Sequence, residues 1–349
     1  IYRKLQERLD EIPNGYPSTE SGVELKLLAK LFTIEEAGLA ASMSMEPLTI
    51  PEIARENRLE EAEAKGMLMG MVKKGLIDVK REPGVGFVFM LIPFVVGFYE
   101  KQNAKIDKEF AELFEVYYKE AFHTKMVIEP SVHRIIPVEK TIPVNIDVMP
   151  YEKASSYLDG AQSYGVLDCI CRVQQKLVGK GCDHTVENCL TFSRKTGVFE
   201  NAENIRAISK EEALEILEQA NREGLVHSTN NAQEDVWYIC NCCTCSCGVL
   251  RGIAEYGSLS SVARSDFYAR VNEDLCTACE DCIGRCQFNA LEMKDDVCTV
   301  NKIFCFGCGL CITSCPSGAL TLEQKDIVEL IPPPKDDEAW RKMRAKAVQ

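Results

Sequence analysis

The sequence contains no long apolar run and is poor in positive charge. Its longest apolar stretch, residues 85–99, is shorter than the roughly 20 residues that a helix needs to cross a membrane, and Pro93 interrupts it. Lys and Arg number 40 against 53 Asp and Glu, which gives a formal charge of −13. A surface of this sign repels nucleic acid and favours protein partners with basic docking patches. We therefore expect no membrane span and no nucleic-acid partner.

Two further patterns are missing. No G-x-G-x-x-G loop follows a strand-like segment, so no flavin or nicotinamide site is expected. No segment has the features of a signal peptide, and closely spaced cysteines pair poorly in disulfides, so we expect the 18 cysteines to be reduced thiols. These absences favour a cytoplasmic protein, in the reducing cytoplasm of an anaerobe, whose cysteines bind metal.

Eight of the cysteines form two copies of one pattern near the end of the sequence. The pattern is C-x2-C-x2-C-x3-C, and each cysteine of the second copy lies 29 residues after its counterpart. Three thiolates at this spacing surround one compact object, as in 4Fe–4S clusters, and the fourth cysteine of each copy binds the other cluster. One cluster is thus expected on Cys276, Cys279, Cys282 and Cys315. The second is expected on Cys305, Cys308, Cys311 and Cys286.

This duplicated segment resembles the bacterial dicluster ferredoxin family over about residues 270–322. The second copy matches the family pattern fully, including Pro316, whereas the first has Gln287 where a proline is usual. The resemblance implies a ferredoxin domain with two 4Fe–4S clusters. A pair of zinc sites is the alternative, but zinc sites normally use separated C-x2-C pairs. Cys298 lies outside both motifs, and we expect it to be a buried packing thiol.

Nine more cysteines are concentrated in the middle of the chain. They are Cys169, Cys171, Cys182 and Cys189, followed by Cys240, Cys242, Cys243, Cys245 and Cys247. This crowding favours one or two additional iron–sulfur clusters, and the first four thiols match one cubane by number. A zinc site and simple core packing are the alternatives. The C-x-C and C-C arrangement is also similar to that of anaerobe proteins with a ferredoxin domain, which implies electron transfer.

Three polar residues near these cysteines each have two alternative roles. His184 lies two residues after Cys182 and could replace a thiolate, but we expect a surface-loop histidine. Arg172 and Lys176 either offset the charge of a cluster or are ordinary charges on the face of a helix.

The N-terminal residues predict a winged-helix-like domain. Residues 49–54 and 60–74 have the pattern of two helices, and residues 76–89 resemble a two-stranded wing. The second helix begins with three glutamates, at positions 60, 61 and 63, which would face the phosphates of DNA. A docking or structural role is therefore expected in place of DNA binding.

The sequence as a whole predicts an α+β chain of five segments. Residues 1–99 form the winged-helix-like domain, and residues 100–150 form a helix and an extended linker, in which Pro137 and Pro143 favour extended segments or edge strands. Residues 151–265 form a mixed cysteine-rich iron–sulfur domain, and residues 266–323 form the dicluster ferredoxin domain. Residues 324–349 form a tail with a basic helix, which we expect to fold back onto the chain's own acidic surface; docking onto a partner is the alternative.

The function expected from these segments is low-potential electron transfer. We expect a protein or subunit that relays single electrons between redox partner proteins. Because no substrate site is evident in the sequence, whether the chain is itself an enzyme stays open. The alternatives are an iron–sulfur oxidoreductase with a catalytic cluster in residues 169–247 and, less favoured, a redox-sensing transcriptional regulator.

Overall fold

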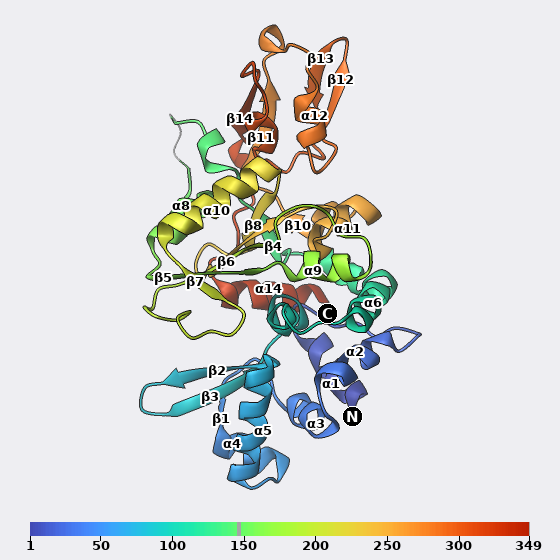
Figure 1. Ribbon diagram of the computed structural model, residues 1–349, viewed down its shortest axis with the longest axis vertical. Helices are drawn as coiled ribbons and strands as arrows, with labels where there is room; N and C mark the ends of the chain where they lie inside the picture. Colours follow the sequence, from blue (N-terminus) through green and yellow to red (C-terminus); the bar gives the residue numbers. More distant parts are fainter. Residues whose placement is uncertain (145–147, 349) are drawn as a thin grey trace. The chain divides into compact units, whose positions relative to one another are not determined.

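The computed structural model describes residues 1–144 and 148–348, which fall into two compact units. The first unit comprises residues 1–125 and 173–180 with Val348, and the second comprises residues 126–172 and 181–347. Both mix helices and strands, in agreement with the expected α+β class (Figure 1). Residues 126–150, expected as part of a linker, belong to the same unit as the cysteine-rich and ferredoxin segments. Residues 145–147 of that linker lie outside the described residues.

Among the described helices, none is both long enough and apolar enough to span a membrane.

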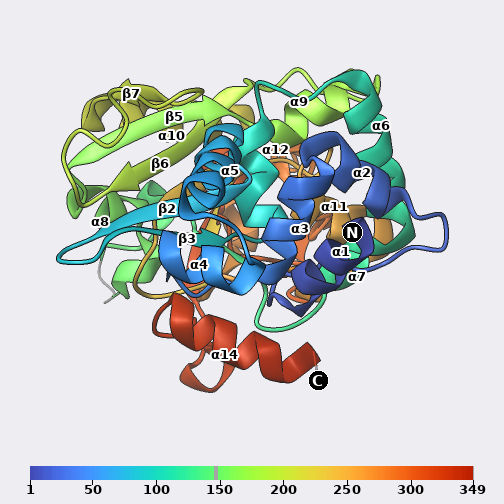
Figure 2. The ribbon, with the colours of Figure 1, turned by 90° about the horizontal axis from the view of Figure 1, so that it is seen from below.

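The first unit contains the helices and the hairpin expected near the N-terminus, together with helices that the sequence did not indicate. Its elements are α1 (Tyr2–Glu11), α2 (Val23–Leu31), α3 (Ile34–Ser42), β1 (Leu48–Thr49), α4 (Ile50–Asn57), α5 (Glu61–Lys74), β2 (Ile77–Glu82) and β3 (Gly86–Leu91). The strands pair antiparallel in the order β1-β3-β2, and Figure 2 shows α4 and α5 beside the β2–β3 hairpin. The assignment to the winged-helix class stays a prediction.

Local signals in the sequence set the ends of these helices. The Glu52 carboxylate accepts a hydrogen bond of 2.8 Å from the Thr49 backbone N–H and so caps α4. Gly75, in the left-handed conformation, ends α5. Further along the chain, α6 (Lys108–Tyr117) begins after Asp107, whose side chain accepts from the Phe110 N–H at 2.8 Å. The helix therefore starts at residue 108, within the segment expected to contain a helix.

The second unit is built on a seven-stranded sheet in the order β10-β4-β8-β9-β6-β5-β7. Its strands are β4 (His133–Ile135), β5 (Ser163–Asp168), β6 (Glu187–Ser193), β7 (Arg206–Ile208), β8 (Val226–Asn230), β9 (Tyr238–Cys242) and β10 (Val262–Ala263). β4 pairs with strands on both sides, so the edge-strand alternative is wrong for this segment. The prolines that suggested an edge, Pro137 and Pro143, lie beyond the strand and do not interrupt its ladder.

The two faces of this sheet have different roles. Leu190 and Phe192 of β6 point into an apolar core formed with α8 (Ala154–Asp159) and α10 (Lys210–Glu223). Because side chains alternate along a strand, Cys189 lies on the opposite face. The Ser209 side chain caps α10 by accepting from the Glu212 N–H at 3.1 Å. The core face is thus apolar, and the other face presents thiols.

The ferredoxin segment repeats one backbone path twice. It contains β11 (Phe267–Val271), α12 (Asp281–Arg285), β12 (Leu291–Lys294), β13 (Val297–Val300), α13 (Leu310–Thr313) and β14 (Leu320–Gln324), in which β11 pairs with β14 and β12 with β13. Three positions with positive φ in the first copy recur 29 residues later: Ala278, Glu280 and Asn289, then Gly307, Gly309 and Gly318. The repeat seen in the sequence is therefore also a repeat of backbone conformation.

The C-terminal helix α14 (Asp337–Val348) folds back onto its own unit, as expected. The Trp340 indole N–H donates to the carbonyl of Ser131 at 2.9 Å. Arg344 is buried and donates to the carbonyl of Pro130 at 2.8 Å, and burial lowers the pKa of its guanidinium to about 10. Backbone carbonyls therefore hold this helix, whereas its basic residues had suggested contact with the acidic surface of the chain.

Candidate metal centres

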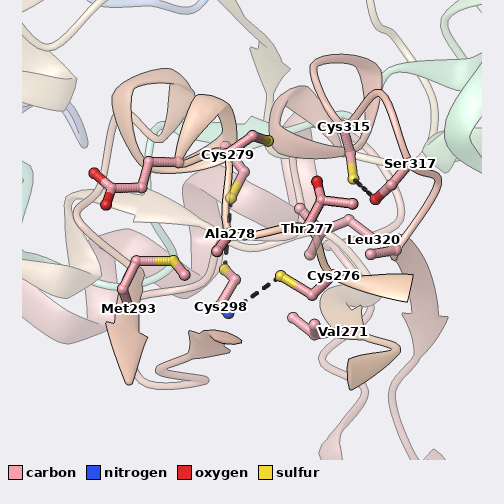
Figure 3. Close-up of a pocket in the computed structure, with 13 residues that line it drawn as sticks. Val271, Cys276, Thr277, Ala278, Cys279, Met293, Cys298, Cys315, Ser317 and Leu320 are labelled. Carbon is pink, nitrogen blue, oxygen red and sulfur yellow. Dashed lines mark hydrogen bonds between the residues drawn. The ribbon is translucent and has the colours of Figure 1, made fainter. Parts of the chain in front are cut away.

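The first ferredoxin cavity is lined by the four cysteines expected to share a cluster. Cys276, Cys279, Cys282 and Cys315 line an open volume of about 330 Å³, shown in Figure 3. Cys298 lines the same cavity, so this buried thiol is part of its wall. The Cys298 backbone N–H donates to the Cys276 sulfur at 3.5 Å, and the Cys282 and Cys298 sulfurs lie 3.5 Å apart. Burial raises the pKa of the Cys298 thiol to about 12.

The second ferredoxin cavity has the complementary set. Cys286, Cys305, Cys308 and Cys311 line an open volume of about 360 Å³. Backbone N–H groups of Ala269 and Ala290 donate to the sulfurs of Cys305 and Cys286, each at 3.3 Å. Such hydrogen bonds raise the reduction potential of an iron–sulfur cluster. Burial raises the pKa of the Cys308 thiol to about 12, so metal binding at this cavity releases protons.

Both cavities fit a 4Fe–4S cluster in the number and kind of ligands. Each combines three cysteines from one copy of the motif with one from the other copy, as the sequence predicts. Four thiolates facing one space are the ligand set that a cubane requires. The arrangement exists because each fourth cysteine follows a short helix that leads its chain toward the other half.

Gly307 occupies a position where the backbone requires glycine. Its φ is +70°, and a Cβ atom there would lie 2.2 Å from the Phe267 carbonyl oxygen and 2.2 Å from the Ser265 hydroxyl. We expect Gly307→Ala to destabilise the protein by at least about 2 kcal/mol and to lower its iron content. Ala278→Gly, at the equivalent place in the first copy, should change stability by less than about 1 kcal/mol. Anaerobic thermal unfolding with an iron assay measures both, and equal melting temperatures would contradict the argument.

Six of the nine middle cysteines form a ring of contacts, called here the six-thiol ring. Each thiol is a close neighbour of two other thiols of the set, and the neighbouring pairs form a closed ring. The members are Cys169, Cys171, Cys189, Cys240, Cys242 and Cys247. Hydrogen bonds from Cys240 and Cys247 lower the pKa of Cys242 to about 6, so one member ionises readily.

The sheet brings these six thiols together. β6 and β9 are neighbours, and the pairing of Leu190 with Ile239 sets Cys189 opposite Cys240 on one face. Cys242 follows on the same face two residues later. The remaining thiols come from the ends of elements beside this face, at the end of β5, the start of α9 (Ile170–Leu177) and the residue preceding α11 (Gly248–Tyr256).

The other three middle cysteines lie with His184 in a second group, called here the four-ligand group. Its members are Cys182, His184, Cys243 and Cys245, whose ligand atoms all lie within 4.8 Å of one another. This corrects the expectation that Cys182 shares a cubane with Cys169, Cys171 and Cys189. The chain between Cys171 and Cys182 carries Cys182 to the end of β9, where Cys243 follows the strand. His184 is likewise a member of the group and not only a surface-loop residue.

Arg172 is a buried cation beside both groups. It is 2% exposed, and its guanidinium donates to the Asn188 side-chain oxygen at 2.8 Å and to the Asn241 carbonyl at 2.6 Å. Burial acts to lower the pKa of Arg172, but the charges of nearby thiols, led by Cys169, raise it above its usual range. Arg172 is thus placed to offset cluster charge, whereas Lys176 is an exposed charge on the helix.

Gln287, where the ferredoxin pattern usually has proline, connects the second ferredoxin cavity to the middle cysteines. Its side-chain oxygen accepts from the Thr244 backbone N–H at 3.1 Å and from the Thr244 hydroxyl at 2.8 Å, while its amide nitrogen donates to the Gly224 carbonyl at 2.8 Å. Gln287 directly follows Cys286 in the sequence, and Thr244 separates Cys243 from Cys245. A proline could make none of these hydrogen bonds.

Comparison with known proteins supports an iron–sulfur segment in this chain. Residues 299–321 match a family model described as a 4Fe-4S binding domain. The matched range contains Cys305, Cys308, Cys311 and Cys315. No curated protein matches the chain. The match indicates at least one 4Fe–4S cluster, and with the other cysteines it points to iron–sulfur electron transfer or redox function.

Proposed function

We propose that the chain is a low-potential electron-transfer protein that relays single electrons between partner proteins. Two 4Fe–4S clusters would bind in the ferredoxin cavities and a further cluster in the six-thiol ring. The six-thiol ring is the main support for this proposal, because it supplies a third all-thiolate site in addition to the two four-cysteine cavities. When bound, each cluster accepts and returns one electron.

The chemistry of the six-thiol ring favours iron–sulfur ligation over substrate catalysis. All six donors are cysteine sulfurs, the soft ligands that iron–sulfur clusters take. A cubane uses four thiolates, so the ring exceeds the requirement and leaves no iron without a protein ligand. Complete thiolate ligation and a chain charge of −13 both disfavour adding an electron. The potentials should therefore lie toward the low end of the range of roughly −700 to +450 mV known for such clusters.

The contacts of Gln287 support a relay through the chain. The hydrogen bonds from Gln287 to Thr244 join the loop of Cys286, in the second ferredoxin cavity, to the segment between Cys242 and Cys247 of the ring. These contacts hold the two loops together, which favours electron transfer between the two proposed clusters. The acidic surface favours docking partners with basic patches.

The first unit is proposed to have a docking or structural role and not to read DNA. Glu61 and Glu63 lie exposed in the first turn of α5, directly after the exposed Glu60. These carboxylates would repel the phosphates of a duplex if this helix approached it.

Iron content tests the proposal. Protein purified without oxygen should hold about 12 irons, four for each of three clusters. The variant Cys169→Ser/Cys189→Ser/Cys240→Ser should lose about four irons and keep the EPR signals of the ferredoxin segment, because three remaining thiols cannot complete a cubane. A single substitution would leave five thiols, so it is a weaker test. Cys298→Ala, which removes a thiol outside the ring, should keep all the iron.

Two results would contradict this assignment. Eight irons in the parent protein, with two zinc ions lost in the triple variant, would make the ring a two-metal zinc cluster on six thiolates. An EPR signal of the ring cluster that changes on addition of cyanide would show an accessible iron and favour the catalytic alternative.

A further inference from the structure

Four ligand atoms outside the six-thiol ring are spaced for one metal ion. The sulfurs of Cys182 and Cys243 lie 3.9 Å apart, as do the Cys245 sulfur and the His184 Nδ1 atom. In a tetrahedral zinc site with Zn–S bonds of about 2.3 Å and Zn–N bonds of about 2.0 Å, neighbouring ligand atoms are about 3.5–3.8 Å apart. The four-ligand group therefore needs only a small adjustment to surround one ion.

The donor set also distinguishes this group from the candidate iron–sulfur sites. In the four-ligand group all four atoms lie within 4.8 Å of one another. The group also includes an imidazole, whereas both ferredoxin cavities and the ring use thiols alone.

The composition of the group is that of a structural zinc site. Three thiolates and one imidazole form the Cys₃His set. Two ligands, Cys182 and His184, come from the loop before β6, and two, Cys243 and Cys245, from the loop between β9 and α11. Each pair is separated by one residue, so an ion bound by all four would tie the two loops together.

Neighbouring residues hold both loops in place. Thr185, which follows His184, donates from its backbone N–H and its hydroxyl to the Glu223 carboxylate at 2.9 and 2.5 Å. The Ser246 hydroxyl lies 3.5 Å from the Cys182 sulfur. Outer contacts of this kind fix the orientation of metal ligands. Glu223 belongs to α10, and Ser246 belongs to the loop between β9 and α11.

We propose that Cys182, His184, Cys243 and Cys245 bind a structural zinc ion that joins the two loops flanking the six-thiol ring. The ion would carry no electrons, since Zn²⁺ has no redox chemistry. Its binding would hold the start of β6 and the end of β9 together, and these strands supply Cys189, Cys240 and Cys242 of the ring. The zinc site is thus a support for the neighbouring ring.

Zinc and iron assayed together on the full-length protein test this inference. The parent protein should retain about one zinc per chain after washing with a chelator. His184→Ala should lose this zinc while keeping the eight irons of the ferredoxin segment, whereas His184→Cys should keep it as a Cys₄ site. Cys308→Ser is the matched control: it should lose about four irons and no zinc. Cobalt(II) bound in place of zinc should give the visible absorption of a tetrahedral site, and His184→Ala should remove it.

The outcomes separate this inference from the proposed function. A parent protein without zinc, in which His184→Ala loses iron, would overturn the zinc site and assign the group to an iron centre. If the His184→Ala variant retained all of its zinc, that result would also overturn the zinc site. If the ring itself binds two zinc ions, the proposed relay fails, but the loss of one further zinc in His184→Ala still supports this site.

Discussion

Cys286→Ser is expected to remove the cluster of the second ferredoxin cavity and about four irons, although Cys286 belongs to the first copy of the motif. The reason is geometric. Cys286 lines the cavity of Cys305, Cys308 and Cys311 and accepts a hydrogen bond from the Ala290 N–H at 3.3 Å. Serine offers a harder oxygen in place of a soft thiolate, and the cluster is then short of one ligand.

EPR of the reduced protein measures this effect. Cys286→Ser and Cys308→Ser should lose the same signal, while Cys279→Ser should lose the other one. Iron should fall by a similar amount in all three variants, which controls for general damage. If the spectrum of Cys286→Ser matched that of Cys279→Ser, each cluster would be bound within one copy, and the exchange of ligands between the copies would be refuted.

Arg172→Met should lower the midpoint potential of the cluster proposed for the six-thiol ring by on the order of 100 mV. A unit charge about 6 Å from a cluster, at an effective dielectric constant of about 20, contributes about 3 kcal/mol. For a one-electron couple this energy corresponds to on the order of 100 mV. The sign follows from the charge: a buried cation beside Cys169 stabilises the more negative, reduced state. Methionine fills the space of the arginine side chain but provides no positive charge to offset the negative charge of the reduced state.

A redox titration followed by EPR measures the shift, with the ferredoxin signals as internal references. Arg172→Lys keeps the charge but loses the planar fork that bonds to Asn188 and Asn241, so it should reduce stability more than potential. A ring signal with the parent potential in Arg172→Met would show that this cation does not tune the cluster.

The ferredoxin segment could be predicted from the sequence because its ligands are set by local spacing. The C-x2-C-x2-C-x3-C pattern fixes three thiols within one loop, and the 29-residue repeat supplies the partner half. The structure places the expected four cysteines around each cavity. Gln287 showed in the sequence as a departure from the family pattern, but its contact with Thr244 depends on the fold.

The grouping of the nine middle cysteines could not be predicted, because it depends on strand order. β6 pairs with β9 across almost 50 residues of chain, and no local pattern indicates that Cys189 lies opposite Cys240. The same holds for His184, which lies within reach of Cys245 only once two loops meet. One signal was present in the sequence: His184 lies two residues after Cys182 and could replace a thiolate, although we expected a surface-loop histidine there.

The peptide bond between Cys242 and Cys243 joins two groups of candidate metal ligands that share no residue. Cys242 belongs to the six-thiol ring and Cys243 to the four-ligand group. A slip of β9 by one residue against β6 would turn every side chain of the strand to the other face and disrupt both groups at once. Bound metals would therefore stabilise the correct strand register, because a chain with mispaired strands could bind metal at neither site. Metal content would then report correct folding of the sheet as well as redox competence.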